Sequence, residues 1–269
     1  PWDKYSQIVG REYVSGAMEN TTAVIHGEQA YQMPGQLIDG NIQEDTIAHE
    51  LFHHWFGNLV TAESWSNLTL NESFANYSEY LWREYKYGKD DADAHLLEDV
   101  TVYKQGENFD KHLVRYYYKD KEDLFDAVSY NKGGAIVHML RNYVGDAAFF
   151  AALKLYLSEY KYKTAEVHQL RMAFEKVTGK DLNWFFNQWY FGKGHPNVLV
   201  SYDYNTLEKK VMVNISQRGT VFEFPLAIDI VEDGEVIRKN VFVDGADASF
   251  VFSYSKTPEV ILINSDGVL

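Results

Sequence analysis

The stretch HELFHHWFGN, residues 49–58, decides how this 269-residue chain is interpreted. On a helix over about residues 43–56, His49 and His53 project from one face, a turn apart. Two imidazoles so placed can bind one zinc ion. Glu50 lies about a quarter turn from His49, where a carboxylate beside the metal can act as a base. His54 lies well off this face, and we interpret it as a neighbour of the site, not a ligand.

A catalytic zinc site usually has three protein ligands, so the motif requires a third. Glu72, in LTLNESFANYSEY, follows His53 after 18 residues that contain a loop and the start of a second helix, expected from about residue 70 to beyond 80. Antiparallel packing of the two helices would bring Glu72 opposite the histidines. Glu63, in the loop, and Glu79, on the same face as Glu72, are the alternatives. Glu79 is equally suited to accept the second N–H of a ligating histidine or to remain a solvated glutamate.

The composition excludes several classes of site. The chain has no cysteine, so disulfides and thiolate ligands are absent and any metal must be held by nitrogen and oxygen. The net charge of −14 argues against nucleic acid and acidic membrane surfaces as partners. No apolar run approaches the length of a membrane span. The chain starts at Pro1 without a signal-like segment, and we expect it to be processed or cut from a longer protein.

The periodicity of the residue pattern changes along the chain. Residues 1 to about 40 have strand and turn patterns, and residues 42–192 have a helical period. GKGHPN, residues 192–197, is the expected linker. After it the period becomes two, which predicts a small all-β module, most simply a sandwich. The fold class is therefore α+β.

Local signals predict several element ends. Asp146 and Thr164 are expected to cap helices, and Gly179 is expected to end the second of these. In the β-module, Asp233-Gly234 and Asp244-Gly245 are expected to form hairpin turns.

Three motifs resemble the gluzincin aminopeptidases, the aminopeptidase N-like family. The first is HExxH followed after 18 residues by the glutamate of LNESFA. The second is GAMEN, residues 16–20, and the third is SYNKGG, which contains Tyr130. The resemblance implies a thermolysin-like, mainly helical catalytic domain with a short N-terminal β part over residues 1–193. It also implies a β-sandwich domain over residues 194–269.

The resemblance implies a role for each site residue. His49, His53 and Glu72 would hold one zinc ion as cofactor. Glu50 would take a proton from the attacking water and pass it to the leaving amine. Tyr130 would donate a hydrogen bond to the oxyanion.

The GAMEN segment would bind peptide substrates that have a free N-terminus. Glu19 would hold the substrate α-ammonium, which explains removal of one N-terminal residue at a time. The backbone of Gly16 and Ala17 could pair with an extended peptide, Met18 would line the side-chain pocket, and Asn20 completes the motif.

This chain departs from the family pattern at three points. Thr21-Thr22 replaces Trp-Gly after GAMEN, and Ser73 replaces the glycine after the third ligand. Few residues precede GAMEN, so we expect a chain that lacks an N-terminal domain and has weak or no activity alone. The alternatives are another zinc hydrolase on this scaffold, an endopeptidase or epoxide hydrolase, and a binding or structural module. The preferred residue, the compartment and the oligomeric state stay open.

Overall fold

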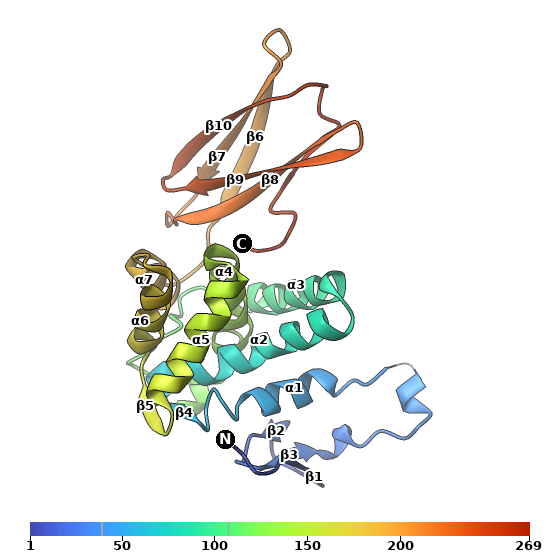
Figure 1. The fold of residues 1–269 in the computed structure, drawn as a ribbon, viewed down its shortest axis with the longest axis vertical. Helices are drawn as coiled ribbons and strands as arrows, with labels where there is room; N and C mark the ends of the chain where they lie inside the picture. The colour runs from blue at the N-terminus through green and yellow to red at the C-terminus, as the bar shows by residue number, and fades with distance from the viewer. Residues whose placement is uncertain (39, 107) are drawn as a thin grey trace. The chain divides into compact units, whose positions relative to one another are not determined.

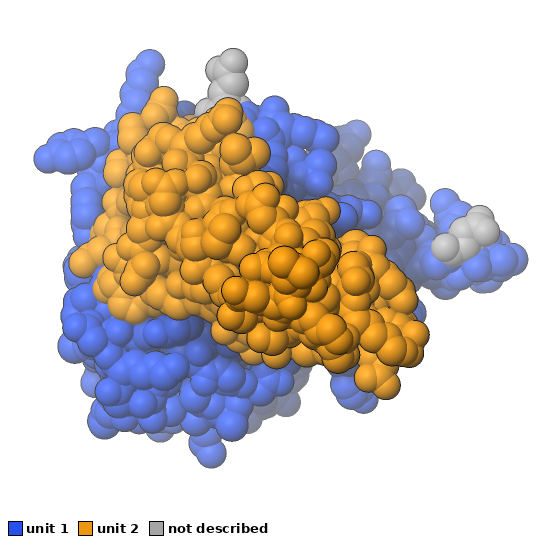
Figure 2. Space-filling view, turned by 90° about the horizontal axis from the view of Figure 1, so that it is seen from above, with its two compact units in different colours: residues 1–108, 113–183 blue, residues 109–112, 184–269 orange. Residues whose placement is uncertain are grey.

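The computed structural model describes residues 1–38, 40–106 and 108–269. These residues form two compact units (Figure 2). The first consists of residues 1–108 and 113–183, and the second of residues 109–112 and 184–269. The predicted domain boundary between residues 193 and 194 stays a prediction. None of the described helices has the length and apolar character needed to cross a bilayer.

The first unit combines a small sheet with a bundle of helices (Figure 1). Its strands are β1 (Ser6–Gly10), β2 (Ala17–Met18), β3 (Ala23–Gly27), β4 (Val60–Ala62) and β5 (Lys163–Ala165). Its α-helices are α1 (Glu44–Phe52), α2 (Thr69–Lys86), α3 (Lys89–Gln105), α4 (Gly133–Val144), α5 (Asp146–Tyr160) and α6 (Val167–Thr178). Short helical turns are η1 (Glu28–Ala30), η2 (Gln36–Ile38), η3 (Trp65–Asn67), η4 (Lys121–Leu124) and the π-helical η5 (Val128–Lys132).

Helix α2 organises this unit, because it contacts α1, α3, α4 and η5. Its buried residues Leu70, Phe74 and Tyr77 recur at helical spacing and form one apolar face. The ring of Phe74 stacks on Phe56 at 4.5 Å, and Phe56 in turn stacks on Tyr156 at 6.0 Å. This aromatic contact fixes α2 against the segment that follows α1, and so fixes the two helices that carry the zinc motif.

The N-terminal sheet has the strand order β1-β3-β2. Strands β1 and β3 are parallel, and β2 pairs antiparallel with β3, with Ala17 opposite His26. Because β2 lies at the end of this order, the GAMEN segment occupies a sheet edge. This confirms the predicted short β part.

Helix α7 spans Asn183–Trp189, and the second unit contains it from Trp184 onward. The unit also contains two three-stranded antiparallel sheets, with the strand orders β10-β7-β6 and β11-β8-β9. Its strands are β6 (Val198–Asn205), β7 (Lys210–Gln217), β8 (Phe224–Glu232), β9 (Glu235–Val243), β10 (Asp247–Ser253) and β11 (Val260–Ile263). Asp233-Gly234 joins β8 to β9 in a hairpin, as predicted, with positive φ at both residues. Asp244-Gly245 was wrongly predicted as a hairpin turn, because β9 and β10 belong to different sheets.

Three predicted helix ends are wrong. Helix α1 ends at Phe52, not 56, because the chain turns back through Gly57, whose φ is 138°. Thr164 lies in β5, paired with Thr61 of β4, and Glu166 caps α6 instead. Asp146 is the first residue of α5 and its carboxylate pairs with Arg141, so it is not the cap. Gly179 ends α6 in the left-handed conformation, as predicted.

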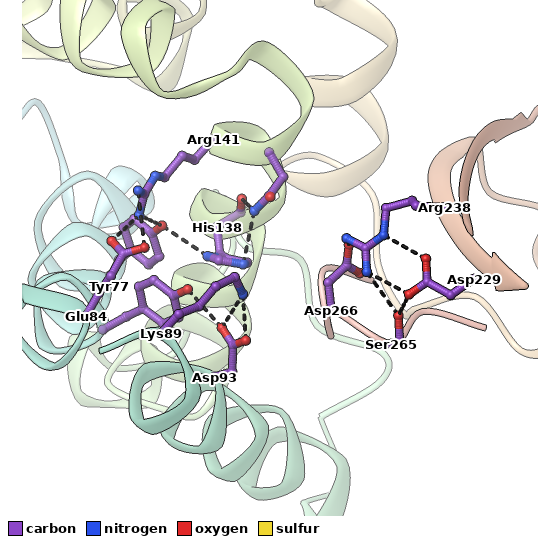
Figure 3. A network of polar contacts seen from close by, with 12 residues as sticks. Tyr77, Glu84, Lys89, Asp93, His138, Arg141, Asp229, Arg238, Ser265 and Asp266 are labelled. Atoms are coloured by element: carbon purple, nitrogen blue, oxygen red, sulfur yellow. Dashed lines mark hydrogen bonds and ion pairs between the residues drawn. The ribbon is translucent and has the colours of Figure 1, made fainter. Parts of the chain in front are cut away.

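Each unit contains its own polar network, centred on the buried Arg141 in the first and on the buried Asp229 in the second (Figure 3). In the first unit, Arg141 donates to Glu84 (2.7 Å) and to the hydroxyl of Tyr77 (3.3 Å), which also bonds His138 Nδ1 (3.0 Å). In the second unit, Arg238 donates two hydrogen bonds of 2.8 Å to Asp229. Charges that are paired in this way tolerate burial.

Candidate metal centre and substrate site

Helices α1 and α2 bring His49, His53 and Glu72 together. The backbone N–H of His53 donates to the carbonyl of His49 at 3.2 Å, so both imidazoles lie on one face, one turn apart. The Nε2 atoms of His49 and His53 each lie 3.4 Å from the same oxygen of Glu72, Oε2. All three residues are buried. The three predicted ligands therefore converge on one point.

Outer hydrogen bonds fix the orientation of both imidazoles. His49 Nδ1 lies 2.8 Å from Glu79 Oε1, and His53 Nδ1 lies 3.0 Å from the carbonyl of Phe56. Because these partners accept hydrogen bonds, they favour protonated Nδ1 atoms, and Nε2 is the atom of each ring that faces Glu72. Glu79 thus lies where an outer-shell partner belongs. Glu63, the other alternative ligand, is in neither group of described residues that could hold a metal.

The donor set fits a zinc ion. Two neutral imidazole nitrogens and one carboxylate oxygen are a common ligand set of catalytic zinc, and they leave a fourth position open. Burial alone would raise the pKa of Glu72, but its bonds to the two histidines hold it well below the usual range. The third ligand is therefore ionised, as a metal requires.

Glu50 lies beside this cluster, with a ligand-capable atom within 4.8 Å of one of His53, but it is not a member of the His49, His53 and Glu72 group. Its Oε2 is buried and has no hydrogen-bond partner among the described residues. Burial raises the pKa of Glu50 to about 7, against the opposing effect of His49 and His53. A carboxylate with a pKa near neutrality can both accept and return a proton.

Tyr130 contacts the imidazole of His49. Its ring stacks on that imidazole with centroids 5.9 Å apart and planes 14° apart. Burial, followed by the charge of Glu72, raises the pKa of Tyr130 above its usual range, so the phenol keeps its proton and can donate it to a hydrogen bond.

The segment that carries Tyr130 is the π-helical turn η5, and its N-terminus is capped. Asp126 Oδ1 accepts the backbone N–H groups of Val128 and Ser129, both at 3.1 Å. Arg115 donates to both oxygens of Asp126, at 2.7 and 3.0 Å, and to Ser129 Oγ at 2.7 Å. Neither Arg115 nor Asp126 was predicted as a site residue from the sequence. The Asp-x-x-Ser spacing before Tyr130 was a signal for the cap, but nothing local points to Arg115.

The GAMEN segment brings one more carboxylate, Glu19, close to Glu50 and His53. One ligand-capable atom each of Glu19, Glu50 and His53 lies within 4.8 Å of the others. Glu19 is partly buried, whereas Gly16, Met18 and Asn20 are exposed, and Ala17 is intermediate. Within Gly16–Asn20, Glu19 is therefore the residue that contributes a ligand-capable atom close to Glu50 and His53.

Two residues of the opening stretch hold this segment. Asn58 Nδ2 donates to the carbonyl of Glu19 at 2.7 Å. The backbone N–H of Thr22 donates to His54 Nε2 at 3.0 Å. His54 was predicted to lie off the ligand face, and among the described residues it belongs to neither group that could hold a metal. Its contact with Thr22 was not predicted.

Comparisons with known proteins identify the family of this chain. The profile of the peptidase family M1 domain matches residues 1–189. Aminopeptidase M1-C of Oryza sativa subsp. japonica is 30% identical over 77% of this chain and 24% of its own length. Probable aminopeptidase 1 of Sulfurisphaera tokodaii is 28% identical over 95% of this chain and 33% of its own length.

The fold is also similar to a solved one. Aminopeptidase A of Legionella pneumophila, crystallised with aspartic acid, superposes with a TM-score of 0.79 at 21% identity, over 97% of this chain and 31% of that one. The chain thus spans about a quarter to a third of the length of these relatives. The match over most of the chain, together with the fold, confirms the predicted α+β thermolysin-like architecture and the resemblance, and the chain belongs to peptidase family M1.

Proposed function

We propose that this chain carries the catalytic centre of a zinc aminopeptidase that releases N-terminal residues from peptides. The observation that carries the proposal is the convergence of His49 Nε2, His53 Nε2 and Glu72 Oε2, beside two further carboxylates, Glu50 and Glu19. Family M1 membership implies zinc, and the donor set fits it. His49, His53 and Glu72 would hold one ion.

Each residue around the metal has a distinct task. A bound zinc would lower the pKa of a water molecule and polarise the scissile carbonyl. Glu50, with its pKa of about 7, accepts the proton of the attacking water and then donates it to the departing amine. Tyr130, protonated at neutral pH, donates a hydrogen bond to the carbonyl oxygen as negative charge develops there.

Glu19 gives the site its exopeptidase character in this proposal. Its carboxylate lies within 4.8 Å of Glu50 and is partly buried, so a substrate ammonium between them forms a charge-assisted hydrogen bond. A substrate without a charged amine leaves Glu19 unpaired. The penalty for leaving this partly buried charge unpaired is about 2 kcal/mol, or roughly 30-fold in kcat/KM.

The test compares a panel of short peptides with their N-acetylated counterparts. We expect cleavage of the free-amine peptides and at least about 30-fold slower cleavage of the acetylated ones. Glu19→Gln, which keeps the shape and removes the charge, should reduce this discrimination, mainly through KM. Equal cleavage of both peptide sets by the unmodified chain would refute the aminopeptidase assignment and favour an endopeptidase.

A further inference from the structure

His54 is the one histidine of the HELFHHWFGN stretch outside the metal cluster, yet its side chain is buried to 1% exposure. Its Nε2 accepts the backbone N–H of Thr22 at 3.0 Å, and its Nδ1 lies 3.3 Å from the backbone carbonyl of Glu50. A backbone N–H can only donate and a carbonyl can only accept. The two partners therefore select one neutral tautomer, with the proton on Nδ1.

Two aromatic side chains hold the imidazole in this orientation. Trp2 and Tyr5 meet the ring of His54 edge-on, with centroids 5.9 and 5.1 Å away. Packing on the ring and hydrogen bonds at both nitrogens leave it a single position, so it is a rigid point of attachment for Thr22.

The residue that His54 holds is conformationally strained. The N–H of Ala23 donates to the carbonyl of Asn20 at 2.9 Å, which closes a four-residue turn with Thr22 at its third position. The φ angle of Thr22 is 65°, typical of a type II turn, in which glycine usually occupies this position. A β-branched residue is an outlier there, so the turn requires an external contact to persist.

This turn directly follows Glu19. On the preceding side, the amide of Asn58 donates to the carbonyl of Glu19 itself at 2.7 Å. The carboxylate-bearing residue is thus held between two contacts, one from Asn58 and one from His54. Both originate in the segment that also carries Glu50 and His53.

We propose that His54 is a positioning residue for Glu19. Its Nε2 holds Thr22 in the strained turn and so sets the distance between the Glu19 carboxylate and the metal cluster. The proposal rests on the proposed role of Glu19 in binding the substrate amine. Loss of the bond should weaken amine binding equally in the ground state and the transition state, and so raise KM with little change in kcat.

Two variants that differ by one methylene test the bond. In His54→Gln the side-chain oxygen reaches the position of Nε2 and can accept from Thr22. In His54→Asn the amide matches only Nδ1, so it can donate to the Glu50 carbonyl but does not reach Thr22. We expect about a tenfold rise in KM for free-amine peptides in His54→Asn, and less than about twofold in His54→Gln.

A third variant separates positioning from general damage. Glycine adopts a φ of 65° without strain, so Thr22→Gly should make the turn less dependent on His54. The His54→Asn/Thr22→Gly double variant should return KM to within about threefold of the wild type. Zinc content should stay the same in all variants, and His168→Asn, at an exposed histidine of α6, is the control.

A measurement without substrate completes the test. In the wild type, ¹⁵N spectra should show His54 protonated at Nδ1 only, and amide exchange at Thr22 should be slow. His54→Asn should accelerate this exchange. Equal KM and equal exchange in His54→Asn and His54→Gln, or no rescue by Thr22→Gly, would overturn the proposal. If the wild-type protein cleaves acetylated and free peptides equally, the proposed function is refuted instead. The amide exchange data alone would then test whether His54 holds Thr22 in the turn.

Discussion

Gly133 is a position where a single methyl group should damage both stability and the site. A Cβ at this residue would lie 1.9 Å from Ser73 Oγ and 2.6 Å from Ser73 Cβ. Ser73 Oγ donates to the carbonyl of Ser129 at 2.7 Å and shares a 2.6 Å hydrogen bond with Thr69 Oγ1. Gly133→Ala must therefore displace Ser73 Oγ from both bonds and, because the Ser73 Cβ contact remains, also strain the packing of α4 against α2.

The magnitude follows from three effects. Overpacking of a tight contact costs about 1–3 kcal/mol. Loss of the two buried hydrogen bonds of Ser73 costs about 2 kcal/mol in total. The higher helix propensity of alanine offsets about 1 kcal/mol. We expect a net destabilisation of about 2–4 kcal/mol, or a fall in Tm of roughly 5–15 °C. Because Tyr130 precedes Gly133 by three residues, hydrolysis should fall as well.

Thermal and urea unfolding of three variants test this reasoning. Gly133→Ala should show the full loss. Gly35→Ala, where no atom lies within 4 Å of the added Cβ, should change stability by less than about 0.5 kcal/mol. The Gly133→Ala/Ser73→Gly double variant removes both clashing atoms and should recover part of the loss. A Gly133→Ala protein as stable as the wild type, or one that Ser73→Gly does not rescue, would refute the close-packing argument.

Two further predictions concern residues around the site, and a third concerns the buried His138. Glu79→Gln should lower zinc affinity by about 10- to 100-fold, measured by competition with a chelator, because His49 loses a charged outer-shell partner; unchanged affinity would contradict this. Arg115→Leu should lower kcat more than it raises KM, because it loosens the cap of the turn that carries Tyr130. The variant should retain zinc. An effect on KM alone would contradict this prediction. Burial lowers the pKa of His138 to about 4, whereas its value in the unfolded chain is near 6.5. Between these two pH values the unfolded chain binds more protons than the folded chain, so the free energy of unfolding falls as the pH drops from 6.5 to 4. In urea unfolding, the decrease in the free energy of unfolding should approach about 3 kcal/mol at pH 4 and be smaller in His138→Asn. Equal decreases in the wild type and His138→Asn would contradict this prediction.

The sequence was sufficient for the metal cluster because its geometry is local. Four-residue spacing on a helix places His49 and His53 together, and the 18-residue gap leaves room for one loop and an antiparallel return to Glu72. Glu79 follows from the same helical period. These residues depend on two helices and the contact between them, which the apolar face of α2 determines.

The structural features that could not be predicted from the sequence depend on contacts between distant segments. Thr164 resembles a helix cap, but parallel pairing with Thr61 places it in a strand. Asp244-Gly245 has a hairpin signature, but it joins two different sheets. The bond between His54 and Thr22 joins residues 32 positions apart, and no periodicity or spacing rule predicts it.

Zinc stoichiometry tests the central claim most directly. Metal content per chain should be measured after equilibration with zinc for the wild type, Glu72→Ala, Glu50→Gln and Glu63→Ala. We predict one zinc in the wild type, strongly reduced zinc in Glu72→Ala, and one zinc with loss of hydrolysis in Glu50→Gln. Glu63→Ala, the loop alternative to Glu72, should retain one zinc. Full zinc retention in Glu72→Ala would contradict the ligand set on which the account rests.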